Sequence, residues 1–228
     1  MLLFYSALMS VRENLEYIKK TVKTAARECA RAPETIKLVA VSKNQPLEKI
    51  TEALECGHRL FGENRVQEAL SHWRDLKSRT PGLLLHLIGP LQTNKVKEAV
   101  ALFDMIETLD REKLARALSK EMKKQNRPIP CLIQVNTGHE EQKAGIPPDQ
   151  LPAFLNFCRT ECHLDIRGLM CIPPVDDPPA LHFAFLKKLA SENGLEELSM
   201  GMSADYEKAI PLGATYIRVG TALFGQRP

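Results

Sequence analysis

The chain lacks three features that would direct its interpretation at once: a strong charge of one sign, a long apolar run, and paired cysteines. Its 31 basic and 28 acidic residues leave a formal charge of +3, which predicts no strong field for nucleic acid or a membrane surface. No apolar run approaches the roughly 20 residues that span a bilayer. Hydrophobic residues make up 44% and charged residues 26% of the 228 positions, a balance that excludes a disordered chain.

The six cysteines form no C-x-x-C pair. A secreted disulfide framework is usually shorter and denser in cysteine, so we expect reduced thiols in a cytoplasmic protein. No histidine has metal-ligand spacing to another His, Cys or carboxylate, and we expect no metal. His86 falls inside a predicted strand, where we interpret it as a hydrogen-bonded core histidine.

The first nine residues are apolar but short, and they lack the basic leader of a secretory signal. We treat residues 1–9 as a disordered start, or as one assigned too early with Met9 as the true initiator. No linker or low-complexity stretch follows. Residues 1–228 are therefore predicted to form a single domain.

Strand-like and helix-like segments alternate along most of the chain. The predicted strands span residues 36–42, 59–63, 83–89, 105–109, 130–136, 166–172, 197–202 and 216–219. The predicted helices span residues 10–30, 47–56, 66–77, 95–102, 111–124, 149–159, 179–192 and 205–210.

Several of these strands are near-continuous apolar runs, which is typical of parallel strands covered on both faces. Eight repeated strand–helix units favour closure into a (β/α)8 TIM barrel. An open doubly wound sheet is the alternative, but no Gly-rich dinucleotide fingerprint follows the first strand. In a barrel, the chemistry gathers where the strands end.

Lys43 follows the first predicted strand directly. One interpretation is a solvated lysine at a strand end. The other is an imine-forming lysine, because burial lowers the pKa of an amine and leaves it free to attack an aldehyde.

The loops after the seventh and eighth strands contain Ser203 and the pair Gly220–Thr221. Barrels often bind phosphate with these two loops. Ser203 could cap the helix that follows it and face an anion there, and Gly220 allows a close approach of backbone N–H groups. Plain capping and turn chemistry is the competing interpretation.

Arg218 stands within the last predicted strand. A buried arginine needs a partner, which is either a neighbouring carboxylate or an acceptor on a ligand. A pyridine nitrogen is such an acceptor in enzymes that use pyridoxal 5′-phosphate (PLP). A lysine, a phosphate cup and an inward arginine on one barrel rim together fit bound PLP.

At these residues the sequence resembles the YggS/PROSC family of pyridoxal phosphate homeostasis proteins. The matching stretches are LVAVSKNQP (38–46), FGENRVQEA (61–69), HLIGPLQTNK (86–95), IRGLMCIP (166–173), LSMGMSADYEKAI (198–210) and IRVGTALFG (217–225). They run in family order from the first strand to the last. The resemblance thus covers essentially the whole chain.

The resemblance implies a barrel like the N-terminal domain of alanine racemase, with PLP as an aldimine on Lys43. It supports Ser203, Gly220 and Thr221 at the phosphate and Arg218 at the pyridine nitrogen. It also implies that Asn64 and Met170 line the cofactor.

The family is expected to hold and deliver PLP inside the cell, with PLP-dependent apo-enzymes as partners and without catalysis. No second-domain base follows the eighth unit, which favours this function over a small amino-acid racemase or lyase. A monomer is expected. Many members of the family have an aromatic residue where this chain has Arg65, so we assign no cofactor role to Arg65, and none to Lys143.

Overall fold

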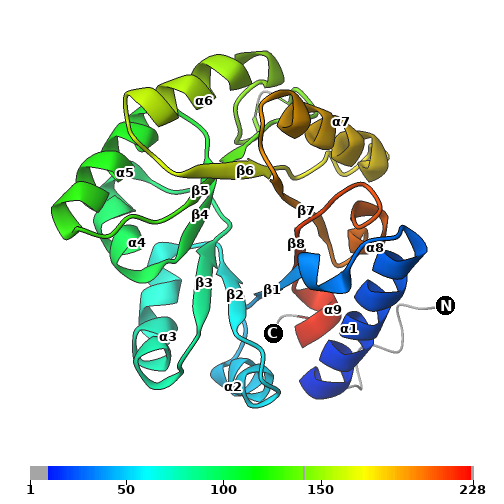
Figure 1. Cartoon of the computed structure of the whole chain (residues 1–228). Coiled ribbons are helices and arrows are strands. Elements are labelled where there is room, and N and C mark those ends of the chain that lie inside the picture. Colours follow the sequence, from blue (N-terminus) through cyan, green and yellow to red (C-terminus); the bar gives the residue numbers. More distant parts are fainter. Residues whose placement is uncertain (1–9, 141, 227–228) are drawn as a thin grey trace.

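The computed structural model describes residues 10–140 and 142–226. Its eight strands are all parallel and close into a barrel in chain order, with the last strand hydrogen-bonded to the first (Figure 1). The strands are β1 (Lys37–Val41), β2 (Leu60–Glu63), β3 (Leu84–Leu87), β4 (Met105–Leu109), β5 (Cys131–Gln134), β6 (Ile166–Met170), β7 (Glu197–Met202) and β8 (Tyr216–Val219). The predicted TIM barrel is confirmed, and the open sheet is excluded. The predicted status of residues 1–9 falls outside the described residues.

Helices surround the barrel on its outer face (Figure 1). They are α1 (Val11–Glu28), α2 (Leu47–Glu55), α3 (Val66–Arg79), α4 (Val96–Leu102), α5 (Glu112–Gln125), α6 (Leu151–Thr160), α7 (Pro179–Glu192), α8 (Tyr206–Ala209) and α9 (Thr221–Phe224). Short 3-10 turns at Pro33–Thr35, Thr93–Lys95 and Pro148–Gln150 precede β1, α4 and α6.

The first helix completes the outer ring. Its N-terminus is fixed by a capping box, in which Ser10 and Glu13 satisfy each other's backbone N–H groups. Apolar residues at helical spacing form its buried face: Val11, Leu15, Ile18, Val22 and Ala26. Helices α8 and α9 contain four residues each, and α1 contacts both of them as well as α2. The N-terminal helix thus packs beside the two short helices and completes the layer of helices around the barrel.

Two apolar clusters lie on opposite sides of the strands. The larger one fills the space between barrel and helices. The smaller one fills the barrel interior with one side chain from each of five strands: Val39, Met105, Leu132, Met170 and Tyr216. Because side chains of a strand alternate between its faces, Arg218 shares the inward face of β8 with Tyr216. The fold therefore places Arg218 above the apolar floor of the barrel.

Candidate functional site

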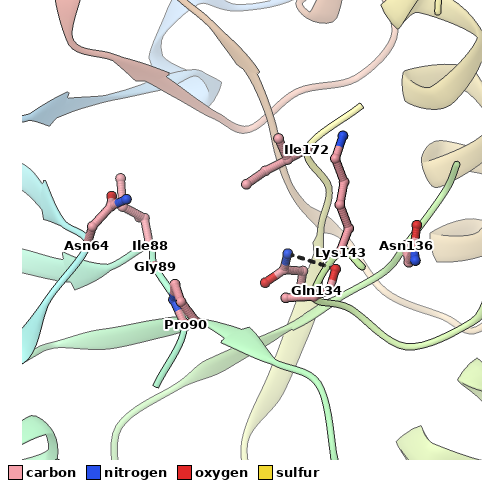
Figure 2. A pocket seen from close by; sticks show the side chains of 9 residues that line it. Asn64, Ile88, Gly89, Pro90, Gln134, Asn136, Lys143 and Ile172 are labelled. Carbon is pink, nitrogen blue, oxygen red and sulfur yellow. Dashed lines mark hydrogen bonds between the residues drawn. The ribbon is translucent and has the colours of Figure 1, made fainter. Parts of the chain in front are cut away.

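A cavity of about 230 Å³ opens at the carboxyl ends of the strands. Asn64, Gly89 and Pro90 lie on one side of it, and Gln134, Lys143 and Ile172 face them from the other (Figure 2). The rest of the lining is Ile88, Asn136 and Ala144. Gln134 is held in place because its side-chain amide donates to the carbonyl of Ala144 at 3.2 Å. Amides, apolar groups and one ammonium group thus surround a space for a small molecule, at the end of the barrel that the sequence predicts.

The loop that carries Lys43 is tied to the β2–α3 unit on both sides of the lysine. Before it, the Ser42 hydroxyl donates to Glu63 Oε1 at 2.6 Å. After it, the backbone N–H of Asn44 donates to the carboxylate of Glu68. Asn44 adopts a left-handed backbone conformation, with φ of 55°, which an asparagine tolerates better than most residues. The half-buried Lys43 therefore sits on a sharply turned loop whose path two carboxylates fix.

Glu63 is itself an unusual group, because this carboxyl is 1% exposed. It accepts a second hydrogen bond from the indole N–H of Trp73 on α3 at 2.9 Å. Burial raises the pKa of Glu63 to about 7, against the hydrogen bonds from Ser42 and Trp73 and the charge of Lys43, which lower it. The carboxyl beside the candidate lysine therefore changes its charge near neutral pH.

Ser203 and Gly220 come together at the ends of β7 and β8. The Ser203 Oγ accepts from the backbone N–H groups of Gly220 and Ala222, both at 3.2 Å. Ser203 therefore caps α9 across the rim. The predicted cap on its own following helix is wrong: Asp205 holds the N-cap position of α8, and no side chain caps that helix. Because the Ser203 oxygen already accepts two N–H groups, its hydroxyl hydrogen is the part of this side chain that can donate to a ligand.

Space is tight around Gly220, which favours a residue without a side chain. A Cβ there would lie 3.3 Å from both the carbonyl oxygen and the Cβ of Val41 on β1. The close packing of β8 against β1 therefore fixes the start of α9. Thr221, the first residue of α9, is exposed.

Arg218 is 4% exposed. Its Nη1 donates to Ser199 Oγ at 2.7 Å, and its Nη2 donates to the carbonyl of Cys171 at 2.8 Å. The nearest carboxylate in this network, Glu107, is reached through Ser199, whose hydroxyl donates to Glu107 Oε2 at 2.5 Å. The sequence left open a carboxylate or a ligand acceptor as the partner of Arg218, and the structure instead gives it a hydroxyl and a backbone carbonyl, which fix the plane of its guanidinium group.

The predicted site residues fall into three groups. Ser203, Gly220 and Thr221 stand on the rim at β7 and β8, and barrel closure puts Lys43 beside them at the end of β1. Asn64 follows β2 and lines the cavity. Met170 and Arg218 lie deeper, with Met170 in the interior apolar cluster. Arg65 is exposed at the N-cap position of α3 and is not among the cavity-lining residues.

Sequence reasoning missed several polar residues that the fold brings to this end or beneath it. Lys143 lines the cavity and pairs with Glu140 at 2.6 Å. The predicted strand 130–136 extended past Gln134, the residue at which β5 ends, so the sequence did not mark Gln134 as a strand-end residue, and nothing local marks Glu107 or Ser199. The expectation for His86 is confirmed: it is buried, and its Nδ1 lies 2.7 Å from Glu107 Oε1.

Three further expectations concern the cysteines, metal binding and membrane-spanning segments of the described residues. All six cysteines are free thiols, and Cys131, Cys158, Cys162 and Cys171 are buried. Within residues 10–140 and 142–226, no three His, Cys, Asp or Glu side chains gather as a metal site. No helix in that part of the chain has the length and apolar character of a membrane span.

Comparison with known proteins identifies the family. The model of the alanine racemase N-terminal domain matches residues 8–228. The pyridoxal phosphate homeostasis protein of Vibrio cholerae is 41% identical over 230 residues, covering 96% of this chain and 98% of that protein. The chain belongs to the family of pyridoxal phosphate homeostasis proteins. Its Escherichia coli (strain K12) relative of the same name is 36% identical over 95% of this chain and 97% of its own length.

Solved structures agree with this assignment. PipY of Synechococcus elongatus, solved with PLP bound, superposes with a TM-score of 0.83 and is 37% identical, covering 95% of this chain and 100% of its own. Alanine racemase of Clostridium difficile shares the fold, with a TM-score of 0.72 at 16% identity. This chain spans 58% of that enzyme.

Proposed function

We propose that this protein binds PLP at the mouth of its barrel and acts in holding and delivering the cofactor inside the cell. The observation that carries the proposal is the full-length match to PipY, whose solved structure has PLP bound. The donor set supports it, because a lysine and a hydroxyl stand on the rim after β1 and β7, and a buried guanidinium group lies deeper, within β8.

The residues present fit the chemical groups of PLP. Lys43 would supply the amine that holds the aldehyde carbon. The Ser203 hydroxyl, with the backbone at Gly220 and Thr221, would hold the phosphate. Arg218 would face the ring nitrogen, and Asn64 and Met170 would line the ring. When bound, PLP supplies an electrophilic aldehyde on an electron-withdrawing ring.

The charge of Arg218 limits what this site can do. A cation beside the ring nitrogen disfavours protonation of that nitrogen. The ring then withdraws electrons weakly, so transamination is disfavoured. Racemisation through two bases needs an acid or base on each face of a bound amino acid. In addition to Lys43, the lining of the described cavity offers one further amine, that of Lys143, which pairs with Glu140 at 2.6 Å, and it offers no carboxylate or imidazole. We therefore favour a non-catalytic carrier.

The carrier function implies partners and a compartment. We propose that PLP-dependent apo-enzymes receive the cofactor and that the protein works in the cytoplasm as a monomer. The six free thiols suit a reducing compartment.

The first experiment tests the cofactor and its lysine. The purified protein is loaded with PLP, its absorbance is recorded, and the complex is reduced with borohydride and mapped by mass spectrometry. We expect a PLP absorbance band and a pyridoxyl group on the Lys43 peptide. Lys43→Ala should remove the band and keep the folded circular dichroism spectrum. Lys97→Ala, an exposed lysine on α4, is the matched control and should behave like wild type. A label on Lys143 would refute the assignment of Lys43, and no band at all would refute PLP binding.

The second experiment separates a carrier from an enzyme. The loaded protein is mixed with an apo-enzyme that needs PLP, and recovery of that enzyme's activity is followed. In parallel, optically pure amino acids are incubated with the loaded protein or with free PLP. A carrier restores the apo-enzyme and turns over amino acids no faster than free PLP does. Loss of optical rotation well above the free-cofactor rate would favour the racemase alternative.

A further inference from the structure

A chain of buried polar side chains crosses the barrel interior from β3 to β8. It consists of His86 on β3, Glu107 on β4, Ser199 on β7 and Arg218 on β8, and none is more than 4% exposed. Successive members are joined by contacts of 2.7, 2.5 and 2.7 Å. Because β5 and β6 separate the two strand pairs, the link from Glu107 to Ser199 reaches across the inside of the barrel.

The chemistry of the groups fixes the direction of each hydrogen bond. Burial by itself raises the pKa of Glu107, but the hydrogen bond and charge of His86, the charge of Arg218 and the hydrogen bond from Ser199 lower it overall. An ionised carboxylate only accepts. Ser199 therefore donates to Glu107 and accepts from Arg218, and His86 carries its proton on Nδ1. Each oxygen of the carboxylate thus has one fixed donor.

This network of hydrogen bonds fixes the orientation of the Arg218 guanidinium group and balances part of its charge. Its Nη1 is held by Ser199 and its Nη2 by the Cys171 carbonyl. A carboxylate one hydroxyl away balances part of its charge. A purely apolar interior would fill the same space, as the five residues of the interior cluster do nearby. The polar chain costs desolvation that an apolar one would avoid, so it calls for a role beyond packing.

We propose that Glu107, acting through Ser199, is a positioning residue: it orients Arg218 toward the ring nitrogen of bound PLP and offsets part of the positive charge that the ring meets there. This inference rests on the proposed function. Neither Glu107 nor Ser199 holds the cofactor. They act on the electronic state of the ring, and the residues of the rim act on retention.

The test is a pH titration of the absorbance of bound PLP. Glu107→Gln keeps the shape of the side chain and an oxygen that accepts from Ser199, but it removes one negative charge. Loss of that charge disfavours protonated forms of the cofactor, so the spectral transition should move to lower pH by about one unit or more. Glu197→Gln is the matched control, because Glu197 begins β7 and contacts Tyr216 at 3.2 Å at the far end of the barrel. Its transition should coincide with that of wild type.

A second variant, Ser199→Ala, tests the inference even if Glu107→Gln does not fold. Ser199→Ala breaks the bridge and keeps both charges. Wild type should bind PLP more tightly than 1-deazapyridoxal phosphate, which lacks the ring nitrogen. Ser199→Ala should reduce this affinity ratio at least threefold, because Arg218 is no longer held toward that nitrogen. A merely structural role would weaken both ligands equally and leave the ratio unchanged.

The outcomes separate this inference from the proposed function. If wild type binds no PLP, the proposed function fails. If wild type binds PLP while folded Glu107→Gln titrates like wild type, the inference is overturned. If Glu107→Gln does not fold, an unchanged ratio in Ser199→Ala overturns it and a reduced ratio supports it.

Discussion

The Ser42 hydroxyl donates to the Glu63 carboxyl at 2.6 Å, immediately before the lysine expected to hold PLP. The contact joins β1 to β2, and the indole of Trp73 joins the same carboxyl to α3 at 2.9 Å. The position of Lys43 thus depends on a buried group whose charge changes near neutral pH. This dependence leads to the first prediction.

Stability should fall with rising pH because of Glu63. Burial raises its pKa to about 7 from a usual 4.5, so the folded state binds more protons than the unfolded state between these values. The free energy of unfolding therefore decreases as pH rises from about 4.5 to 7, by roughly 3 kcal/mol for this group. Glu63→Gln, which still accepts from Ser42 or Trp73, should remove that decrease. Urea unfolding at a series of pH values measures it, and an unchanged slope in the variant would contradict the prediction.

His58 should contribute the opposite slope. Burial lowers its pKa to about 4 from 6.5, although its contact with the carbonyl of Leu60 at 2.7 Å raises it. The unfolded state then binds more protons between these values, so the free energy of unfolding rises with pH from about 4 to 6.5. In wild type the two groups partly cancel. His58→Gln, which retains a donor for Leu60, should therefore steepen the fall in stability with rising pH. A pH profile that matches wild type would contradict the prediction, because it would mean that the pKa of His58 is the same in the folded and unfolded states.

Ser203→Ala should weaken retention of PLP. The hydroxyl is the expected donor to a phosphate oxygen, and one charge-assisted hydrogen bond contributes about 1–2 kcal/mol. The dissociation constant measured by absorbance titration should rise roughly 5- to 30-fold. Ser78→Ala, which removes an exposed hydroxyl on α3, should leave it unchanged. Equal affinities for Ser203→Ala and wild type would remove Ser203 from the phosphate site.

Gly89→Ala should disturb the cavity by steric overlap. A Cβ at Gly89 would lie 2.7 Å from the Cα of Asn64 and overlap its backbone oxygen. The end of β2 has to shift, which costs about 1–3 kcal/mol of stability and displaces Asn64 from the lining. We expect a lower melting temperature together with weaker PLP binding. Wild-type values of both would show that the two strand ends can separate without cost.

Much of this architecture is predictable because its signals are local. Each buried parallel strand is a short apolar run with a helix after it, and the residue that follows such a run must stand near the barrel mouth. Lys43 and Asn64 could be found by that rule. Small errors occur where the local rule is weakest: two predicted helices begin with 3-10 turns, and Ser203 caps α9 across the rim instead of the helix that follows it.

The deeper contacts could not be predicted because they join residues far apart in the chain. Glu107 and Ser199 are separated by 92 positions, and no periodicity or motif pairs them. Their contact exists because barrel closure turns the inner faces of β4 and β7 toward each other. In the same way, Glu63 becomes a buried partner of Ser42 only once β1 and β2 are side by side and α3 covers them.

By itself, the sequence determined the alternation of strands and helices, the closed barrel and the strand-end residues, since these follow from side-chain pattern and chain order. The tertiary structure alone decided which buried groups share protons and charge. Those properties depend on distances across the barrel and on the loss of water around each group, and neither quantity is local in the chain.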